Sequence, residues 1–333
     1  MRIKRRTKRR LIRIVLSIPV ILAGAFLYLY VRGPSSAEPA NRRVEMSPQR
    51  IERGRYLFTA VAACDTCHSD RDFTHLDGPV VAASRGRGRI VAQAGLPGVI
   101  VAGNITPDQE TGIGAWTDGE KIRAIREGIG KDGRALYPMM PYAYYRSMSD
   151  DDVQAVVAYL NSLASIRNPL PKTKVNFPDS MFMTGEPQPL TRAVPPADAY
   201  GGEIYGEYLA TLAACEECHT PRSRMGKITK MRFAGGRLFD TPFGKVNSAN
   251  ITQDRDTGIG SWDFQRFRKR MQAHRGYGKD GPPKAGPENF TVMPWQAYSE
   301  IGDHDLESLF LYVKARVAIA NRVDVHPGYP APR

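Results

Sequence analysis

The pattern Cys-x-x-Cys-His occurs twice in this chain, at residues 64–68 (CDTCH) and 215–219 (CEECH), and uses all four cysteines. Its two thiols can lie about one helical turn apart on the same side of the chain, where both can add to the vinyl groups of one porphyrin. The adjacent imidazole then lies under the ring and can ligate the iron. The pattern therefore predicts two covalently attached c-type haems, one held by Cys64, Cys67 and His68 and one by Cys215, Cys218 and His219.

The surroundings of the pattern repeat as well. Zinc sites and thiol redox sites also use Cys-x-x-Cys, so one copy alone would leave these alternatives open. Residues 54–57 (GRYL) return as 206–209 (GEYL), 104–116 (NITPDQETGIGAW) as 250–262 (NITQDRDTGIGSW), 130–133 (GKDG) as 278–281, and 140–141 (MP) as 293–294. Repetition on this scale indicates a duplicated domain and favours haem at both sites.

Each iron needs a second axial ligand on the side opposite to its histidine. The thioether of methionine favours Fe(II), and a histidine with a methionine is the usual pair in electron-relay haems. We predict Met140 and Met293, because both precede proline at equivalent points of the repeat. Met148 and Met271 fit a core role better. The other histidines have no counterpart in the second copy and are assigned to surface or core roles, the first two being reserve ligands: His75, His274, His304 and His326.

Two residue pairs of the repeated loop are candidates for lining the haem edge, Trp116 with Trp262 and Asn104 with Asn250. An indole N–H or an amide at that edge could donate a hydrogen bond to a haem propionate and tune the potential. In the alternative interpretation, the Asn-Ile-Thr and Gly-Ile-Gly runs are turn chemistry that holds the loop together. The sequence leaves both open.

Residues 1–32 are a basic head followed by 18 uncharged residues, 14–31 (IVLSIPVILAGAFLYLYV). Such a run is just long enough to cross a hydrocarbon core of about 30 Å as a helix. The cations before it predict that the rest of the chain lies outside the cytoplasm. We therefore expect a single-pass anchor in the inner membrane with the haem domains on the periplasmic side. A cleaved signal peptide is the alternative, although its apolar core would be unusually long.

Most of the net charge of +13 belongs to this head, which holds nine cations and no acid. The remainder of the chain carries +4, an excess that suits a solvated surface. A patch that docks an acidic redox partner is compatible with that excess, and no nucleic-acid partner is needed to explain it.

The expected organisation is an anchor (1–32), a tether (33–46), a first haem domain (47–165), a proline-rich connector (166–198), a second haem domain (199–320) and a tail (321–333). Helices are expected from Ser47-Pro48 to Cys64, over 117–127, and from Ser149 onward. No stretch shows sustained strand alternation, so the expected fold class is all-α. The connector holds seven prolines and is either a spacer or a strap packed across both domains.

Over residues 47–318 these motifs resemble those of the membrane-anchored, multi-haem cytochrome c subunits of bacterial alcohol and aldehyde dehydrogenases. The resemblance implies tandem domains of the class I cytochrome c fold, with His68 and Met140 on one iron and His219 and Met293 on the other. It also implies an electron carrier between a periplasmic dehydrogenase and quinone, a terminal oxidase or another cytochrome. The alcohol dehydrogenase subunit typically has three haem domains, whereas this chain has two.

An enzyme is the competing class, either a di-haem peroxidase or a thiosulfate dehydrogenase. A peroxidase needs one iron with an open or displaceable distal site, and the duplicated Met-Pro positions argue against it. Some thiosulfate-oxidising relatives use a cysteine as a haem ligand, and this chain has no cysteine left over. We therefore expect an electron-transfer protein with no catalytic residues of its own, while a methionine-ligated enzyme stays open.

Overall fold

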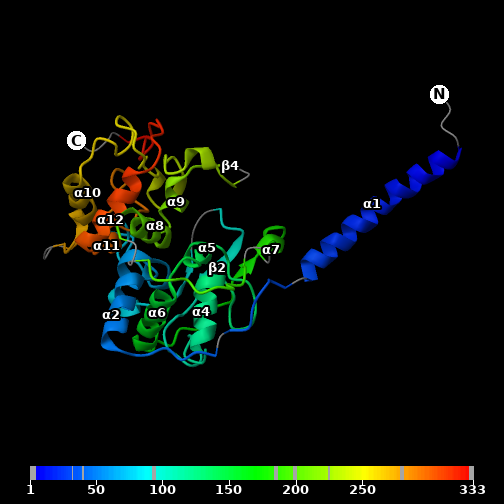
Figure 1. Ribbon diagram of the computed structural model, residues 1–333, viewed down its shortest axis with the longest axis horizontal. Coiled ribbons are helices and arrows are strands. Elements are labelled where there is room, and N and C mark those ends of the chain that lie inside the picture. Colours follow the sequence, from blue (N-terminus) through cyan, green and yellow to red (C-terminus); the bar gives the residue numbers. More distant parts are fainter. Residues whose placement is uncertain are drawn as a thin grey trace.

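The computed structural model describes residues 5–31, 33–39, 41–91, 95–183, 187–197, 201–223, 226–277 and 281–329. Helix α1 (Arg5–Val31) projects away from the rest of the molecule, which forms two lobes (Figure 1). The lower lobe in this view contains the first Cys-x-x-Cys-His run and the upper lobe the second. Part of the second GKDG run, residues 278–280, lies outside the described residues.

The helices of the first lobe begin where the sequence signals place them. Ser47 is the N-cap residue of α2 (Pro48–Tyr56), and a capping box of Thr117 and Glu120 opens α4 (Asp118–Glu127). The hydroxyl of Ser149 accepts a hydrogen bond from the backbone of α6 (Asp150–Ser162). The other helical segments here are a π-helical turn, η1 (Leu57–Val61), then α3 (Asp65–His68), η2 (Ala82–Ser84), α5 (Tyr142–Tyr145) and, in the connector, α7 (Asp179–Phe182).

The second lobe repeats this order. Helix α8 corresponds to α2, α9 to α3, α10 to α4, α11 to α5 and α12 to α6. Their bounds are α8 (Gly202–Leu212), α9 (Cys215–His219), α10 (Phe264–Met271), α11 (Trp295–Tyr298) and α12 (Asp303–Lys314), with short turns η5 (Thr229–Met231) and η6 (Gln272–His274).

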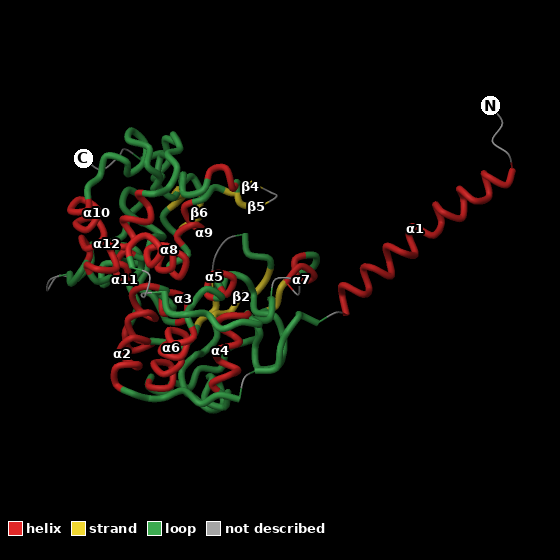
Figure 2. Tube along the Cα trace, viewed as in Figure 1, coloured by secondary structure: helices red, strands yellow, loops and turns green. Residues whose placement is uncertain are grey.

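The expected all-α class is wrong, because small antiparallel sheets accompany the helices (Figure 2). One sheet has the order β1-β2-β3, and two hairpins pair β4 with β5 and β6 with β7. The strands are β1 (Arg89–Val91), β2 (Gly98–Ala102), β3 (Lys174–Val175), β4 (Arg222–Ser223), β5 (Gly226–Lys227), β6 (Leu238–Thr241) and β7 (Gly244–Asn247). Strands of two to five residues are too short to show the period-two alternation by which a strand is recognised.

The expectation of a transmembrane helix is also wrong. Of the helices formed by the described residues, none combines the length and the apolar character needed to cross a membrane. The single-pass membrane anchor expected from the sequence is therefore not supported.

Two glycines explain the repeated Gly-x-Tyr-Leu run. A Cβ atom added to Gly54 would lie 1.8 Å from the carbonyl oxygen of Ala155, and one added to Gly206 would lie 1.9 Å from that of Ser308. The first helix of each lobe thus crosses the last helix with the two backbones in direct contact. These crossings, α2 with α6 and α8 with α12, bury the apolar faces predicted from the spacing and form the centre of the core.

Equivalent segments follow the last helix of each lobe and close over the repeated loop. Asn168 donates from Nδ2 to the carbonyl of Arg87 at 2.8 Å, and Asn321 donates to that of Ala234 at 2.8 Å. Further along the connector, the carbonyl of Val194 accepts a hydrogen bond from the backbone N–H of Asp150. The described part of the connector is therefore bonded to the first lobe, and a strap packed across both domains stays a prediction.

The two lobes meet through a reciprocal contact. The hydroxyl of Tyr56 donates to Asp305 at 2.6 Å and accepts from the backbone N–H of Gly302 at 3.3 Å. In the same way, the hydroxyl of Tyr208 donates to Asp152 at 2.6 Å and accepts from the N–H of Ser149 at 3.2 Å. Each lobe thus sends the tyrosine of its first helix to the start of the last helix in the other lobe, which gives the pair an approximate twofold symmetry.

A loop pair without this symmetry also joins the lobes. The backbone N–H and the amide of Gln296 donate to the carboxylate of Asp77 at 2.9 and 2.7 Å. Beside them, Leu76 donates from its backbone to Pro283, and Ala285 to Thr74. The extra residues of the second copy, which precede Met293, lie in this region and take part in the contact between the lobes.

Candidate haem sites

Each predicted proximal histidine is held by a backbone carbonyl at the same position of the repeat. Nδ1 of His68 lies 2.8 Å from the carbonyl oxygen of Gly103, and Nδ1 of His219 lies 2.7 Å from that of Ala249. A proton on Nδ1 shared with this carbonyl leaves Nε2 as the free lone pair, as an iron ligand requires. Burial lowers the pKa of both histidines, which favours the neutral imidazole.

The thiols lie at the end of a backbone turn that also repeats. Ala63 and Ala214, which precede the first cysteine of each run, adopt a left-handed conformation with φ of 47° and 49°. The carbonyls just before them accept hydrogen bonds from Tyr145 at 3.2 Å and Tyr298 at 2.9 Å. All four cysteines are free, and burial raises the pKa of the Cys64 and Cys215 thiols. The thiols are therefore unpaired, as haem attachment requires.

The two Met-Pro positions lie at equivalent points. Met140 and Met293 are partly buried, pack against the apolar core, and each is followed by proline and a one-turn helix, α5 or α11. Those helices carry Tyr145 and Tyr298, whose hydroxyls bond the turns before the cysteines. Each methionine loop is thereby tied to the cysteine turn of its own lobe. Met148 and Met271, by contrast, are fully buried in the core, 1% and 8% exposed.

Asn104 and Asn250 are buried and bonded within the protein. Nδ2 of Asn104 donates to the carbonyl of Ile166 at 2.7 Å, and its Oδ1 accepts from the hydroxyl of Thr106 at 2.7 Å. Asn250 makes the equivalent bonds to Ile319 and Thr252 at 2.8 and 2.7 Å. This geometry favours the alternative in which the Asn-Ile-Thr run holds its loop.

Trp116 and Trp262 pack at the edge of the core and are partly exposed. Neither indole N–H has a hydrogen-bond partner recorded among the described residues, and the guanidinium of Arg266 lies over the Trp262 ring at 4.8 Å. Their assignment to the haem edge stays a prediction.

Sequence reasoning missed two glycines, one in each lobe, that bond the backbone of the predicted haem histidine. Gly88 donates from its N–H to the carbonyl of His68 at 2.8 Å, and Gly235 donates to that of His219 at 2.7 Å. Both have positive φ, and a Cβ atom on either would lie about 2.5 Å from the backbone of Gly103 or Ala249, whose carbonyls hold the histidines. The signal was present as a glycine at a similar distance after each Cys-x-x-Cys-His run.

Three of the other histidines have partners within the protein. Nδ1 of His75 lies 2.7 Å from Asp72, Nε2 of His326 lies 2.8 Å from the carbonyl of Phe290, and His274 contacts Tyr277. Within the described residues, no group of three or more histidine, cysteine, aspartate or glutamate side chains is arranged to hold a metal ion. The zinc alternative therefore has no ligand set in this part of the chain.

The two cysteine runs approach each other across the contact between lobes. The hydroxyl of Tyr144 in α5 donates to Glu217, inside the second run, at 3.0 Å. Helix α5 packs on α8, and α11 packs on η1, so the turn after each methionine contacts the segment that leads to the other lobe's cysteines. Burial raises the pKa of Cys218, and Cys67 of the first lobe adds to the rise. Both predicted haems would therefore lie next to the same interface.

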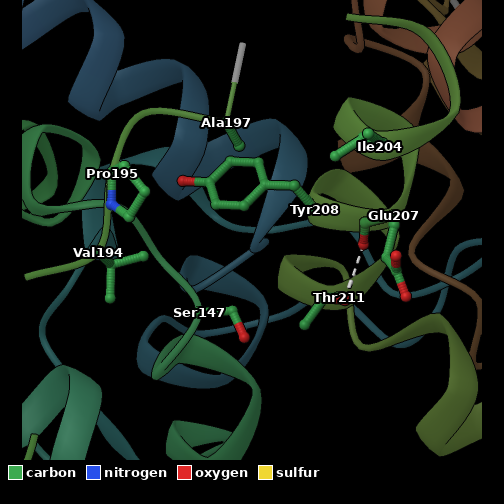
Figure 3. Close-up of a pocket in the computed structure, with 8 residues that line it drawn as sticks. All are labelled: Ser147, Val194, Pro195, Ala197, Ile204, Glu207, Tyr208 and Thr211. Carbon is green, nitrogen blue, oxygen red and sulfur yellow. Dashed lines mark hydrogen bonds between the residues drawn. The ribbon is translucent and has the colours of Figure 1, made fainter. Parts of the chain in front are cut away.

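A cleft of about 310 Å³ lies beside this interface, between the connector and α8 (Figure 3). Tyr208 projects into it, facing Pro195 and Val194 of the connector. None of the predicted haem ligands lines the cleft. It is a gap between the strap and the second lobe, separate from the haem sites.

Comparison with known proteins agrees with these sites. Residues 51–164 match the family model described as Cytochrome c. The match supports the cofactor expected for the first lobe, a covalently bound haem.

Several similar proteins are named as cytochromes or cytochrome subunits. The fructose dehydrogenase cytochrome subunit of Gluconobacter japonicus is 33% identical over 278 residues, which cover 80% of this chain and 52% of that protein. The cytochrome c subunit of the quinone alcohol dehydrogenase of Gluconobacter oxydans is 31% identical over 226 residues, 64% of this chain and 44% of that subunit. A diheme cytochrome c-type protein of Cereibacter sphaeroides is 29% identical over 250 residues, 70% of this chain and 76% of that protein.

The chain spans about half the length of the two dehydrogenase subunits. These relatives confirm the resemblance predicted from the motifs. The two dehydrogenase relatives are named as cytochrome subunits, which agrees with the expectation of an electron-transfer protein.

Proposed function

We propose that this chain is a di-haem c-type cytochrome that carries electrons from a dehydrogenase to a further acceptor. The observation that supports it is the duplicated arrangement: in each lobe a free thiol pair, a histidine with Nδ1 turned to a carbonyl, and a methionine loop tied to the thiols. Bound haem supplies one-electron redox chemistry.

The residues in each lobe have distinct roles toward that group. Cys64 and Cys67 would hold the first haem covalently, with His68 and Met140 as axial ligands. Cys215 and Cys218 would hold the second, with His219 and Met293. Gly103 and Ala249 orient the imidazoles through their carbonyls. Because the lobes are bonded to each other beside both cysteine runs, the two haems would be held at a fixed separation.

The proposed donor is a dehydrogenase, because the relatives are named as cytochrome subunits of fructose and alcohol dehydrogenases. Quinone, a terminal oxidase or another cytochrome is the proposed acceptor. Covalent haem attachment takes place outside the cytoplasm, so the two lobes would work there.

Haem counting tests the proposal directly. The chain is produced together with a cytochrome maturation system, and haem is measured per chain by the alkaline pyridine assay. We expect two haems in the wild type and one in each of the variants Cys64→Ser/Cys67→Ser and Cys215→Ser/Cys218→Ser. A colourless protein, or one that contains zinc, would refute the proposal. A pull-down with the full chain from solubilised membranes, followed by reduction of the bait with the partner's substrate, then identifies the donor.

A further inference from the structure

The duplicated helices α4 and α10 use their basic residues in opposite ways. Helix α4 carries three cations and three acids, and its cations are buried: Lys121 is 7% exposed, Arg123 9% and Arg126 3%. Lys121 bonds Asn161 at 2.7 Å, Arg126 bonds Asp150 at 2.5 Å, and Arg123 bonds the carbonyl of Gly130 at 3.0 Å. The positive charge of α4 is thus used inside the first lobe.

Helix α10 carries four cations and no acid. Arg268 lies 3.3 Å from Asp303, which neutralises it. Arg266, Lys269 and Arg270 are exposed, and no ion pair joins them to any acid of the described chain. We call these three residues the α10 basic face. Like charges this close repel one another, and an acidic surface laid against them would relieve that repulsion.

The α10 basic face lies next to the second methionine loop. The guanidinium of Arg270 lies 4.0 Å from the ring centroid of Trp295, two residues beyond Met293, and that of Arg266 lies 4.8 Å from the Trp262 centroid. A stacked guanidinium keeps its edge N–H groups free to bind carboxylates. In Figure 1, α10 lies at the outer margin of the second lobe, where a partner can approach it.

We propose that the α10 basic face docks an acidic protein surface and thereby forms the site of electron exchange between the second haem and a redox partner. The inference rests on the proposed function, since it takes Met293 to lie beside the second haem. The equivalent helix of the first lobe, α4, presents no such surface, because its cations are buried. The chain would then have one polarised docking site rather than two equal ones.

The chemistry of the face favours a protein over a lipid surface. A membrane-binding face combines cations with exposed apolar side chains that enter the acyl boundary. Here the indoles of Trp262 and Trp295 are partly buried and lie under guanidinium groups. The face therefore presents charge and hydrogen-bond donors, which suit a carboxylate-rich protein surface.

A matched pair of variants tests this assignment. Arg266→Gln/Lys269→Gln removes two charges from the α10 basic face, and Lys230→Gln/Lys245→Gln removes two exposed charges elsewhere on the second lobe. The fully reduced, haem-loaded protein is mixed in stopped flow with oxidised plastocyanin, a copper protein with an acidic face, at low and high ionic strength. We expect the α10 variant to react roughly five-fold more slowly at low salt and to show a weaker salt dependence, with the control close to wild type.

Equal rates in the two variants, or an equal loss in both, would overturn the docking assignment. Haem content and reduction by dithionite are measured on the same samples. If these are normal while the rates are unchanged, the docking inference fails and the proposed function stands. If haem is absent from wild type, the proposed function itself fails. Binding to phosphatidylglycerol vesicles that the α10 variant loses, with an unchanged plastocyanin rate, would instead assign the face to lipid and overturn the proposal.

Discussion

The hydroxyl of Tyr56 donates a 2.6 Å hydrogen bond to Asp305, 249 positions further along the chain. Its symmetry counterpart joins Tyr208 to Asp152 at the same distance. Both carboxylates are buried at the third position of a last helix, and each tyrosine lies in the first helix of the other lobe. The contact between lobes is therefore built from the same elements that form each lobe's core.

Removal of one tyrosine hydroxyl should weaken this contact. Tyr56→Phe leaves the N–H of Gly302 without its partner and removes the 2.6 Å hydrogen bond to Asp305, so we expect the free energy of unfolding to fall by about 1–3 kcal/mol. Denaturant unfolding of the haem-loaded protein measures it. The exposed Tyr329→Phe is the control. A double-mutant cycle with Asp305→Asn that gives no coupling energy would contradict the assignment.

Loss of either axial methionine should be visible in the spectrum. Met140→Ala or Met293→Ala removes the predicted thioether from one iron, so the weak sulfur-to-iron absorption band of the oxidised protein should fall by about half in each variant. Both haems stay attached, because the cysteines are unchanged. Met148→Leu, in the core, should keep the full band. A band unaffected by Met140→Ala would remove that residue from the first iron.

The helix crossings predict an unusual response to alanine. In an exposed helix, replacing glycine with alanine stabilises by about 1 kcal/mol. At Gly54 the new Cβ would lie 1.8 Å from the carbonyl oxygen of Ala155, so we expect Gly54→Ala to destabilise by about 1–3 kcal/mol instead. Thermal unfolding followed by circular dichroism shows whether the substitution raises or lowers the stability. Gly33→Ala, with no atom within 4 Å of the added carbon, should change little.

His274 gives a prediction on pH. Burial and the neighbouring charge of Arg270 lower its pKa from 6.5, with Tyr277 and Trp295 on its other sides. The unfolded chain therefore binds this proton more readily than the folded one, and stability falls as pH drops below 6.5 toward the lowered pKa. His274→Gln should flatten the stability profile in that window and leave it unchanged above pH 7. An identical slope in wild type and variant would contradict this.

Local signals predicted the local structure of this protein well. Ser47 with Pro48, the Thr117 capping box and Ser149 each stand where a helix begins, because a cap acts within one turn of its own chain. The Cys-x-x-Cys-His runs and the methionine loops fall at equivalent points of two lobes, as the repeat predicts. In each of these patterns, the residues that interact are close together both in the sequence and in the structure.

Asp152 shows where such reasoning ends. It lies in the first turn of α6, yet its carboxylate binds Arg53 and Tyr208, the latter from the other lobe. The amide of Asn104 likewise donates to Ile166, 62 positions away. Partners more than 50 positions away leave no trace in a local pattern. The strands were not predicted because two to five residues carry too little alternation. The transmembrane prediction for α1 was wrong because it rested on a count of uncharged residues alone.

The reciprocity of the tyrosine bonds has a consequence for the origin of the chain. An interface in which one patch meets its own copy is the kind that holds symmetric homodimers together. Here the patch on α2 and α6 meets its duplicate on α8 and α12, although both belong to a single polypeptide. Duplication and fusion of an ancestral domain that already paired with itself would give this arrangement without inventing a new surface. The basic helix that distinguishes the two halves would then be a later specialisation, possible once fusion allowed the two copies to diverge.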